Sequence, residues 1–195
     1  MNMTTIGLIR HGVTEWNTSG RAQGHSDIPL SEEGREQARR VAERIASEDE
    51  KWDLVISSDL SRARETAEAI ANKLGLPAPI QDGRIREMHL GQIEGLTLDE
   101  RVTQWGDNWR EQEIGIETKE AVAQRGADFI EEILEEHNGK KILVVSHGGL
   151  IGLTLKHLLP EQFTETLLEN TSITILKHDE TKWDCSLFNC SKHLV

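Results

Sequence analysis

The sequence predicts an α/β protein, a three-layer α/β/α sandwich with a mostly parallel central sheet. Three short apolar runs, at residues 4–9, 53–57 and 141–146, are typical of buried strands. Each run is followed by a segment whose apolar residues recur at helical spacing. Strands that alternate with helices usually form a parallel sheet covered on both faces, and this pattern determines the predicted fold class.

The expected helices follow these strands along the chain, at about 32–45, 60–74, 122–134 and 149–158. Ser31 is a favourable N-cap for the first, and two glutamates in its first turn suit the positive end of a helix. Gly75 is a stop signal for the second. Near the C-terminus, residues 172–178 and 183–189 are expected to form a hairpin.

Residues 1–195 are expected to form a single domain, since this length suits one sizeable core. Residues 81–120 are less regular and rich in glycine, tryptophan and acidic side chains. We expect this segment to be an irregular insertion over one end of the sheet, where ligands of such folds bind.

The charge of the chain excludes several classes of partner. With 22 basic and 34 acidic side chains, the formal net charge is −12, which repels nucleic acid and anionic membrane surfaces. No apolar run approaches membrane length and the first residues lack the apolar core of a signal peptide, so a cytoplasmic location is expected. The sequence predicts no oligomeric state.

The two cysteines, Cys185 and Cys190, lie close together in the sequence. They could form one disulfide or be small buried side chains. Without a secretory signal, reduced thiols are the preferred interpretation.

Candidate functional residues follow two of the predicted strands. Arg10 and His11 come after the first, and His147 and Gly148 come after the strand at 141–146. Because parallel strands end at one edge of a sheet, both histidines should lie there. Arg62 falls in the first turn of a helix, where a cation opposes the helix dipole and would be favoured by an anion. The alternative for Arg62 is pairing with an acidic neighbour on a solvated face.

Two guanidinium groups, two imidazoles and helix N-termini are what a phosphoryl group requires for binding. The chain lacks the Gly-x-x-x-x-Gly-Lys loop, the Cys-x5-Arg loop and the Gly-x-Ser-x-Gly elbow. It also lacks His-Glu-x-x-His and related metal-binding spacings, so no metal or cofactor is expected. Imidazole remains as the candidate nucleophile.

Five motifs in order resemble the histidine phosphatase superfamily, also called phosphoglycerate mutase-like, over nearly the whole chain. They are LIRHGVTEWN (8–17), GHSDIPLSEEGREQA (24–38), SDLSRARETA (58–67), EMHLGQIEG (87–95) and VSHGG (145–149). The chain is most similar to the small cofactor-independent phosphatases of that family. The resemblance implies a phosphoglycerate mutase-like fold with the insertion over the active site, and hydrolysis of a small phosphorylated metabolite.

The resemblance also implies roles for individual residues. His11 would become phosphohistidine, Arg10, Arg62 and His147 would bind the phosphoryl oxygens, and Glu87 would be the general acid and base. The further residues expected to contact substrate or phosphate are Asn17, Gln23, Gly24 and Gly148. Seen without its motif, Glu87 would be expected to pair with Arg84 or Arg86 instead.

Two other functions remain as alternatives. A mutase of the same family would return the phosphoryl group to a second hydroxyl, but the acidic, aromatic stretch at 105–120 lacks the additional basic contacts expected of one. A non-catalytic phosphate-binding or interaction module on the same fold is the second. Trp16, Trp105 and Trp109 could form an apolar wall for the leaving group, although packing is the commoner role of tryptophan.

Overall fold

The central sheet confirms the predicted fold class. In a computed structural model of the chain we describe residues 3–164 and 166–195. In this part of the chain the sheet has six strands in the order β3-β2-β4-β1-β5-β6. They are β1 (Thr4–Arg10), β2 (Leu54–Ser57), β3 (Ile80–Gln81), β4 (Lys141–Ser146), β5 (Ile173–His178) and β6 (Trp183–Cys190). The first four are parallel, and β5 and β6 add the predicted antiparallel hairpin.

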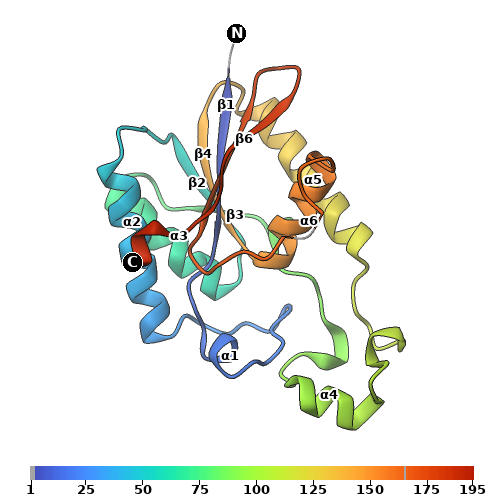
Figure 1. Ribbon diagram of the computed structural model, residues 1–195. Helices are drawn as coiled ribbons and strands as arrows, with labels where there is room; N and C mark the ends of the chain where they lie inside the picture. Colours follow the sequence, from blue (N-terminus) through green and yellow to red (C-terminus); the bar gives the residue numbers. More distant parts are fainter. Residues whose placement is uncertain (1–2, 165) are drawn as a thin grey trace.

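Helices cover both faces of the sheet, as Figure 1 shows. The helices are α1 (Glu15–Thr18), α2 (Glu32–Ser47), α3 (Ser61–Leu74), α4 (Leu98–Trp105), α5 (Lys119–Glu136) and α6 (Gly148–Leu158). The four longest were predicted. The Ser31 hydroxyl accepts from the Gly34 N–H and caps α2, while Gly75 ends α3 in the left-handed conformation that favours glycine.

Alternate side chains of the central strands form two apolar layers. Ile142 and Val144 of β4 face α5 and α6, whereas Leu143 and Val145 face α2 and α3. All four are buried. This two-sided burial explains why the strand has no polar alternation and is recognisable in the sequence as an apolar run.

The segment between β3 and α5 is irregular, as predicted, and lies beyond the carboxyl end of β1 (Figure 1). It holds α4, three short 3₁₀ turns and a small apolar core of its own. Trp109 is buried in that core with Ile93 and Ile114, and Trp105 packs against it. The two tryptophans therefore have the packing role rather than forming a wall for a ligand.

Cys185 and Cys190 are free thiols on the same strand. A strand rises about 3.3 Å per residue, so five positions separate the two Cα atoms by roughly 16 Å. A disulfide requires Cα atoms closer than about 7 Å, so these two cannot pair within one chain. Of the helices described, none is long and apolar enough to cross a membrane.

Candidate active site

The sheet brings the two strand-end histidines together. Arg10 and Ser146 are register partners on the adjacent parallel strands β1 and β4, so the residues that follow them are neighbours. The rings of His11 and His147 lie 5.1 Å apart between centroids, and both side chains are buried. The two histidines therefore lie together at one edge of the sheet, as predicted.

The His11 imidazole is held in one tautomer by its own loop. Its Nδ1 lies 2.6 Å from the Gly12 carbonyl oxygen, which can only accept, so Nδ1 carries the proton. Burial lowers the pKa of His11 well below its usual range, and the charges of Arg62 and Arg10 lower it further. His11 is therefore neutral near pH 7, with the lone pair of Nε2 available for attack.

His147 is oriented by a serine hydroxyl. Its Nε2 lies 2.9 Å from Ser58 Oγ, and that oxygen also accepts from the Leu60 N–H. We assign the ring proton of His147 to Nδ1, the tautomer in which the serine hydroxyl donates to Nε2. Burial also lowers the pKa of His147 well below its usual range, followed by the effect of Arg62. His147 is a neutral hydrogen-bond donor.

Arg62 is fully buried in the first turn of α3, as predicted. Its Nη1 and Nη2 donate to the carbonyl oxygens of Ser26 and Gly24, both at 2.8 Å. Burial lowers the pKa of Arg62 to about 10, against the opposing effect of Glu87, so the guanidinium stays charged at neutral pH. Within the described part of the chain, Arg62 has no ion pair with Asp59 or Glu65, which pair with Arg86 and Arg35 instead.

Arg10 approaches from the end of β1, and its Nη1 donates to the Leu168 carbonyl at 2.5 Å. Burial lowers the pKa of Arg10, while Glu87 raises it. A Cβ on Gly148 would lie 3.3 Å from Arg10 Nε, so the helix start passes close to this cation. In the described residues, Arg10 Nε, Arg62 Nε and His147 Nδ1 are buried nitrogens without a hydrogen-bond partner. Three such donors around one imidazole are suited to an anion.

Glu87 sits at the N-terminus of α6. Its Oε1 accepts from the N–H groups of Met88 at 2.8 Å and Leu150 at 3.1 Å, and its Oε2 accepts from the Gly149 N–H at 3.1 Å. A Cβ on Gly149 would come within 2.4 Å of Oε1, so a larger residue here would displace the Glu87 carboxylate. The alternative partners are occupied elsewhere, because Arg84 pairs with Asp82 and Glu132 and Arg86 pairs with Asp59.

Two amide side chains are held by a residue that sequence reasoning missed. Thr14, fully buried, donates from its hydroxyl to Gln23 Oε1 at 2.7 Å and from its N–H to Asn17 Oδ1 at 3.0 Å. Both amide oxygens face Thr14, so the NH₂ groups remain as donors. Gly24 follows with φ of +53°, and a Cβ there would lie 2.1 Å from Glu94 Oε1.

These groups surround a cleft of about 290 Å³. The lining residues are Arg10, His11, Asn17, Arg21, Gln23, Gly24, Arg62, Glu87, Met88, Leu90 and Gly149. Arg21, Met88 and Leu90 were not predicted, because no local pattern marks them. His147 and Gly148 are not among these lining residues, although the His147 ring lies 5.1 Å from that of His11. In the described chain, no three acidic, histidine or cysteine side chains are grouped so that they could hold a metal ion.

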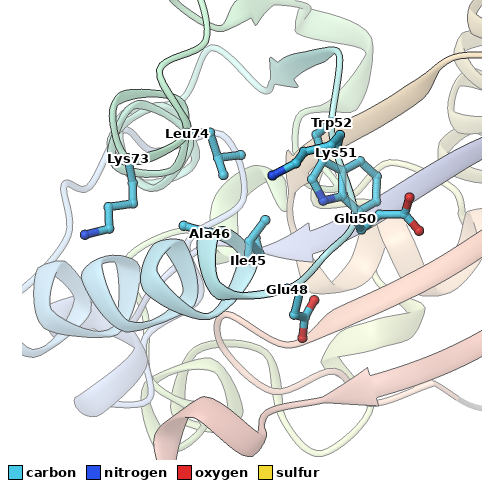
Figure 2. A pocket seen from close by; sticks show the side chains of 8 residues that line it. All are labelled: Ile45, Ala46, Glu48, Glu50, Lys51, Trp52, Lys73 and Leu74. Atoms are coloured by element: carbon cyan, nitrogen blue, oxygen red, sulfur yellow. The ribbon is translucent and has the colours of Figure 1, made fainter.

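A second pocket of about 180 Å³ lies where α2 and α3 end, close to the start of β2 (Figure 2). Its apolar walls come from Ile45, Leu74 and Trp52. Its carboxylates are already paired, Glu48 with Arg44 and Glu50 with Lys141. It lacks the imidazoles and guanidiniums of the first cleft, which is therefore the candidate active site.

Comparison with known proteins agrees with this geometry. The family model described as the histidine phosphatase superfamily (branch 1) matches residues 6–191. A probable phosphoglycerate mutase GpmB from Serratia proteamaculans is 37% identical, with 93% of this chain and 88% of the relative aligned. A metal-independent phosphoserine phosphatase from Arabidopsis thaliana is 33% identical, with 98% of this chain and 84% of the relative aligned.

A solved structure of comparable similarity is a phosphoserine phosphatase from Entamoeba histolytica in complex with phosphoserine. It superimposes with a TM-score of 0.81 at 29% identity and covers 98% of this chain and 100% of its own. The whole fold, including the irregular segment at the carboxyl end of the sheet, is therefore shared.

Proposed function

The chain belongs to branch 1 of the histidine phosphatase superfamily and is a phosphatase of small phosphate monoesters, and we propose that it works through a phosphohistidine on His11. One observation carries this proposal. The buried, neutral imidazole of His11 keeps Nε2 free beside three unpartnered donors. An imidazole in that state is a nucleophile, and the donors match the oxygens of a phosphoryl group.

In the first step Nε2 of His11 attacks phosphorus and the bond to the ester oxygen breaks. Arg10, Arg62 and His147 bind the non-bridging oxygens and stabilise their charge while the phosphoryl group moves. The NH₂ groups of Asn17 and Gln23 and the backbone around Gly24 and Gly148 complete the binding surface. No metal ion or cofactor takes part.

Glu87, in its protonated carboxyl form, supplies the proton that the leaving oxygen needs, because an aliphatic alkoxide is a poor leaving group. The carboxylate then takes a proton from water as that water attacks phosphohistidine. Inorganic phosphate leaves and both His11 and Glu87 return to their starting states. Glu87 lines the same cleft as Arg62 and Arg10, and its charge raises the pKa of both against the larger effect of burial, which supports this assignment.

The substrate is a small phosphorylated metabolite. Related proteins are named for phosphoserine and phosphoglycerate, and a cleft of about 290 Å³ accommodates molecules of that size. The net charge of −12 disfavours nucleic acid as a partner. Residues 1–195 act as one domain and the protein works in the cytoplasm, where its two thiols stay reduced.

The test is to trap the intermediate. Enzyme mixed with a ³²P-labelled monoester and denatured at alkaline pH should carry label that is stable to base and lost in acid. His11→Ala should abolish both label and turnover, while His157→Ala, which removes an exposed imidazole on α6, should change neither. Labelling of His11→Ala, or loss of turnover on adding a chelator, contradicts the mechanism.

The same experiment separates phosphatase from mutase. Labelled enzyme that is chased with unlabelled phosphoglycerate should release inorganic phosphate. Label recovered mainly in phosphoglycerate would instead support the mutase alternative, which the relative named as a probable phosphoglycerate mutase keeps open.

A further inference from the structure

Arg125, on α5, has every guanidinium N–H occupied. Its Nη1 donates to the carbonyl oxygens of Arg84 at 2.6 Å and Arg86 at 2.7 Å, and its Nη2 donates to the carbonyl of Glu87 at 2.9 Å. The Glu117 carboxylate accepts the remaining two, from Nε at 2.9 Å and Nη2 at 3.0 Å. Five donors thus meet five acceptors, three of them on the main chain just before and at Glu87.

The segment that carries Glu87 has no regular structure to hold it. It lies between two 3₁₀ turns, at Gly83–Ile85 and Gly91–Ile93, so no helix or sheet ladder fixes its backbone. The main-chain carbonyl of Glu87, which accepts from Arg125, also accepts a second hydrogen bond, from His25 Nε2 at 2.7 Å. Side-chain donors from elsewhere in the fold do here what a ladder does in a strand.

The side chain of Glu87 tolerates little displacement. Its two oxygens meet three N–H groups within 3.1 Å, and a Cβ at Gly149 would already overlap Oε1. Proton transfer requires the carboxyl to lie within hydrogen-bond reach of the leaving oxygen. A shift of the backbone by 1 Å is therefore sufficient to impair it.

We propose that Arg125 is a positioning residue for Glu87, holding the main chain at residues 84–87 so that the carboxylate stays at the N-terminus of α6. The inference rests on the proposed role of Glu87 as general acid. Arg125 is not among the residues that line the cleft, so it acts through Glu87 and not on the substrate. Its loss should copy the loss of the acid and leave the phosphoryl-binding groups in place.

The predicted signature is a selective loss of rate. Arg125→Met keeps the apolar stem but removes all five donors, and Arg125→Lys keeps the charge with a single nitrogen that cannot reach acceptors on both sides. Single-turnover formation of phosphohistidine should slow by ~10-fold or more with an alkyl phosphate, part of the ~10²–10⁴-fold that general acid catalysis contributes. It should slow much less with 4-nitrophenyl phosphate, whose leaving group needs no proton.

The matched control is Arg44→Met. Arg44 is a buried arginine that likewise donates to a main-chain carbonyl, that of Cys190, and pairs with a carboxylate, that of Glu48, but it has no contact with Glu87. Any change that Arg44→Met causes in the rate of phosphohistidine formation should be the same for the alkyl phosphate and for 4-nitrophenyl phosphate. Glu87→Gln serves as the reference for complete loss of the acid.

The outcomes are distinct. Selective slowing of Glu87→Gln and of either Arg125 variant supports the inference. If Glu87→Gln is selective but both Arg125 variants slow the two esters equally or not at all, Arg125 does not position the acid. If Glu87→Gln itself shows no selectivity, the general-acid assignment fails and the inference fails with it. If Arg125→Met does not fold, the lysine variant decides.

Discussion

Lowering the pH from 7.5 to 5.5 should destabilise the fold through the two buried histidines of the candidate site. The pKa values of His11 and His147 lie well below 6.5 in the folded protein, mainly because of burial. In the unfolded chain both return to about 6.5. Below that pH the unfolded state binds protons that the folded state does not, so the free energy of unfolding falls as the pH falls.

The size of the effect follows from linkage. A histidine that stays neutral when folded and titrates at 6.5 when unfolded contributes a loss of about 1.4 kcal/mol between pH 7.5 and 5.5. The two imidazoles together contribute about 2.7 kcal/mol. Burial of both side chains is nearly complete, at 2% and 0% exposed, so solvent screening does not reduce this value.

Urea unfolding at several pH values measures this loss directly. The variants His11→Asn and His147→Asn remove one titrating group each. In each variant the free energy of unfolding should fall by about 1.4 kcal/mol less between pH 7.5 and 5.5 than it does in the wild type. In the double variant this loss should be smaller than in the wild type by the sum of the two effects, about 2.7 kcal/mol. The reasoning is refuted if the double variant loses as much stability over this range as the wild type, whatever its absolute stability.

Three further predictions concern neighbouring groups. Thr14→Val removes the hydroxyl that orients Gln23 and should raise KM by roughly 5–10-fold, because one hydrogen bond contributes about 1 kcal/mol. Thr14→Ser keeps the hydroxyl and should keep the KM of the wild type. Gly149→Ala should lower kcat for alkyl phosphates by ~10-fold or more through displacement of Glu87, yet leave Tm unchanged or higher because alanine favours helix. Arg62→Lys should lower kcat by ~10²-fold; a change in KM alone would limit the guanidinium to ground-state binding.

The elements of the fold that the sequence predicts are those with a strong local signal. The strands β1, β2 and β4 are buried on both faces, and this produces the apolar runs from which they were predicted. The strand β3 has two exposed residues, Ile80 and Gln81, and α1 has only four residues, so neither has a periodicity to detect. Both exist because of tertiary pairing and capping.

The site was predictable where it depends on strand ends and motifs. His11 and His147 follow parallel neighbours, and topology alone brings them together. Thr14 was missed because its local contact with Asn17 only caps a short helix and its contact with Gln23 forms on folding, and Arg125 was missed because all of its partners are defined by folding. Arg125 is one residue of an amphipathic helix in the sequence, and only the packing of α5 against residues 84–87 gives it three carbonyl acceptors.

The charge distribution gives the clearest link between composition and site. A protein of net charge −12 repels an anionic substrate at long range, but this repulsion is screened beyond about 8 Å at physiological ionic strength. Close to the site, Arg62 is buried and Arg10 is half-buried, and the carboxylate of Glu87 accepts from backbone N–H groups and not from either arginine. The two cations therefore remain available to an incoming phosphate. Burial is the main cause of the lowered pKa of His11, and Arg62 and Arg10 lower it further, so the groups that attract the phosphoryl oxygens also favour the unprotonated, nucleophilic imidazole.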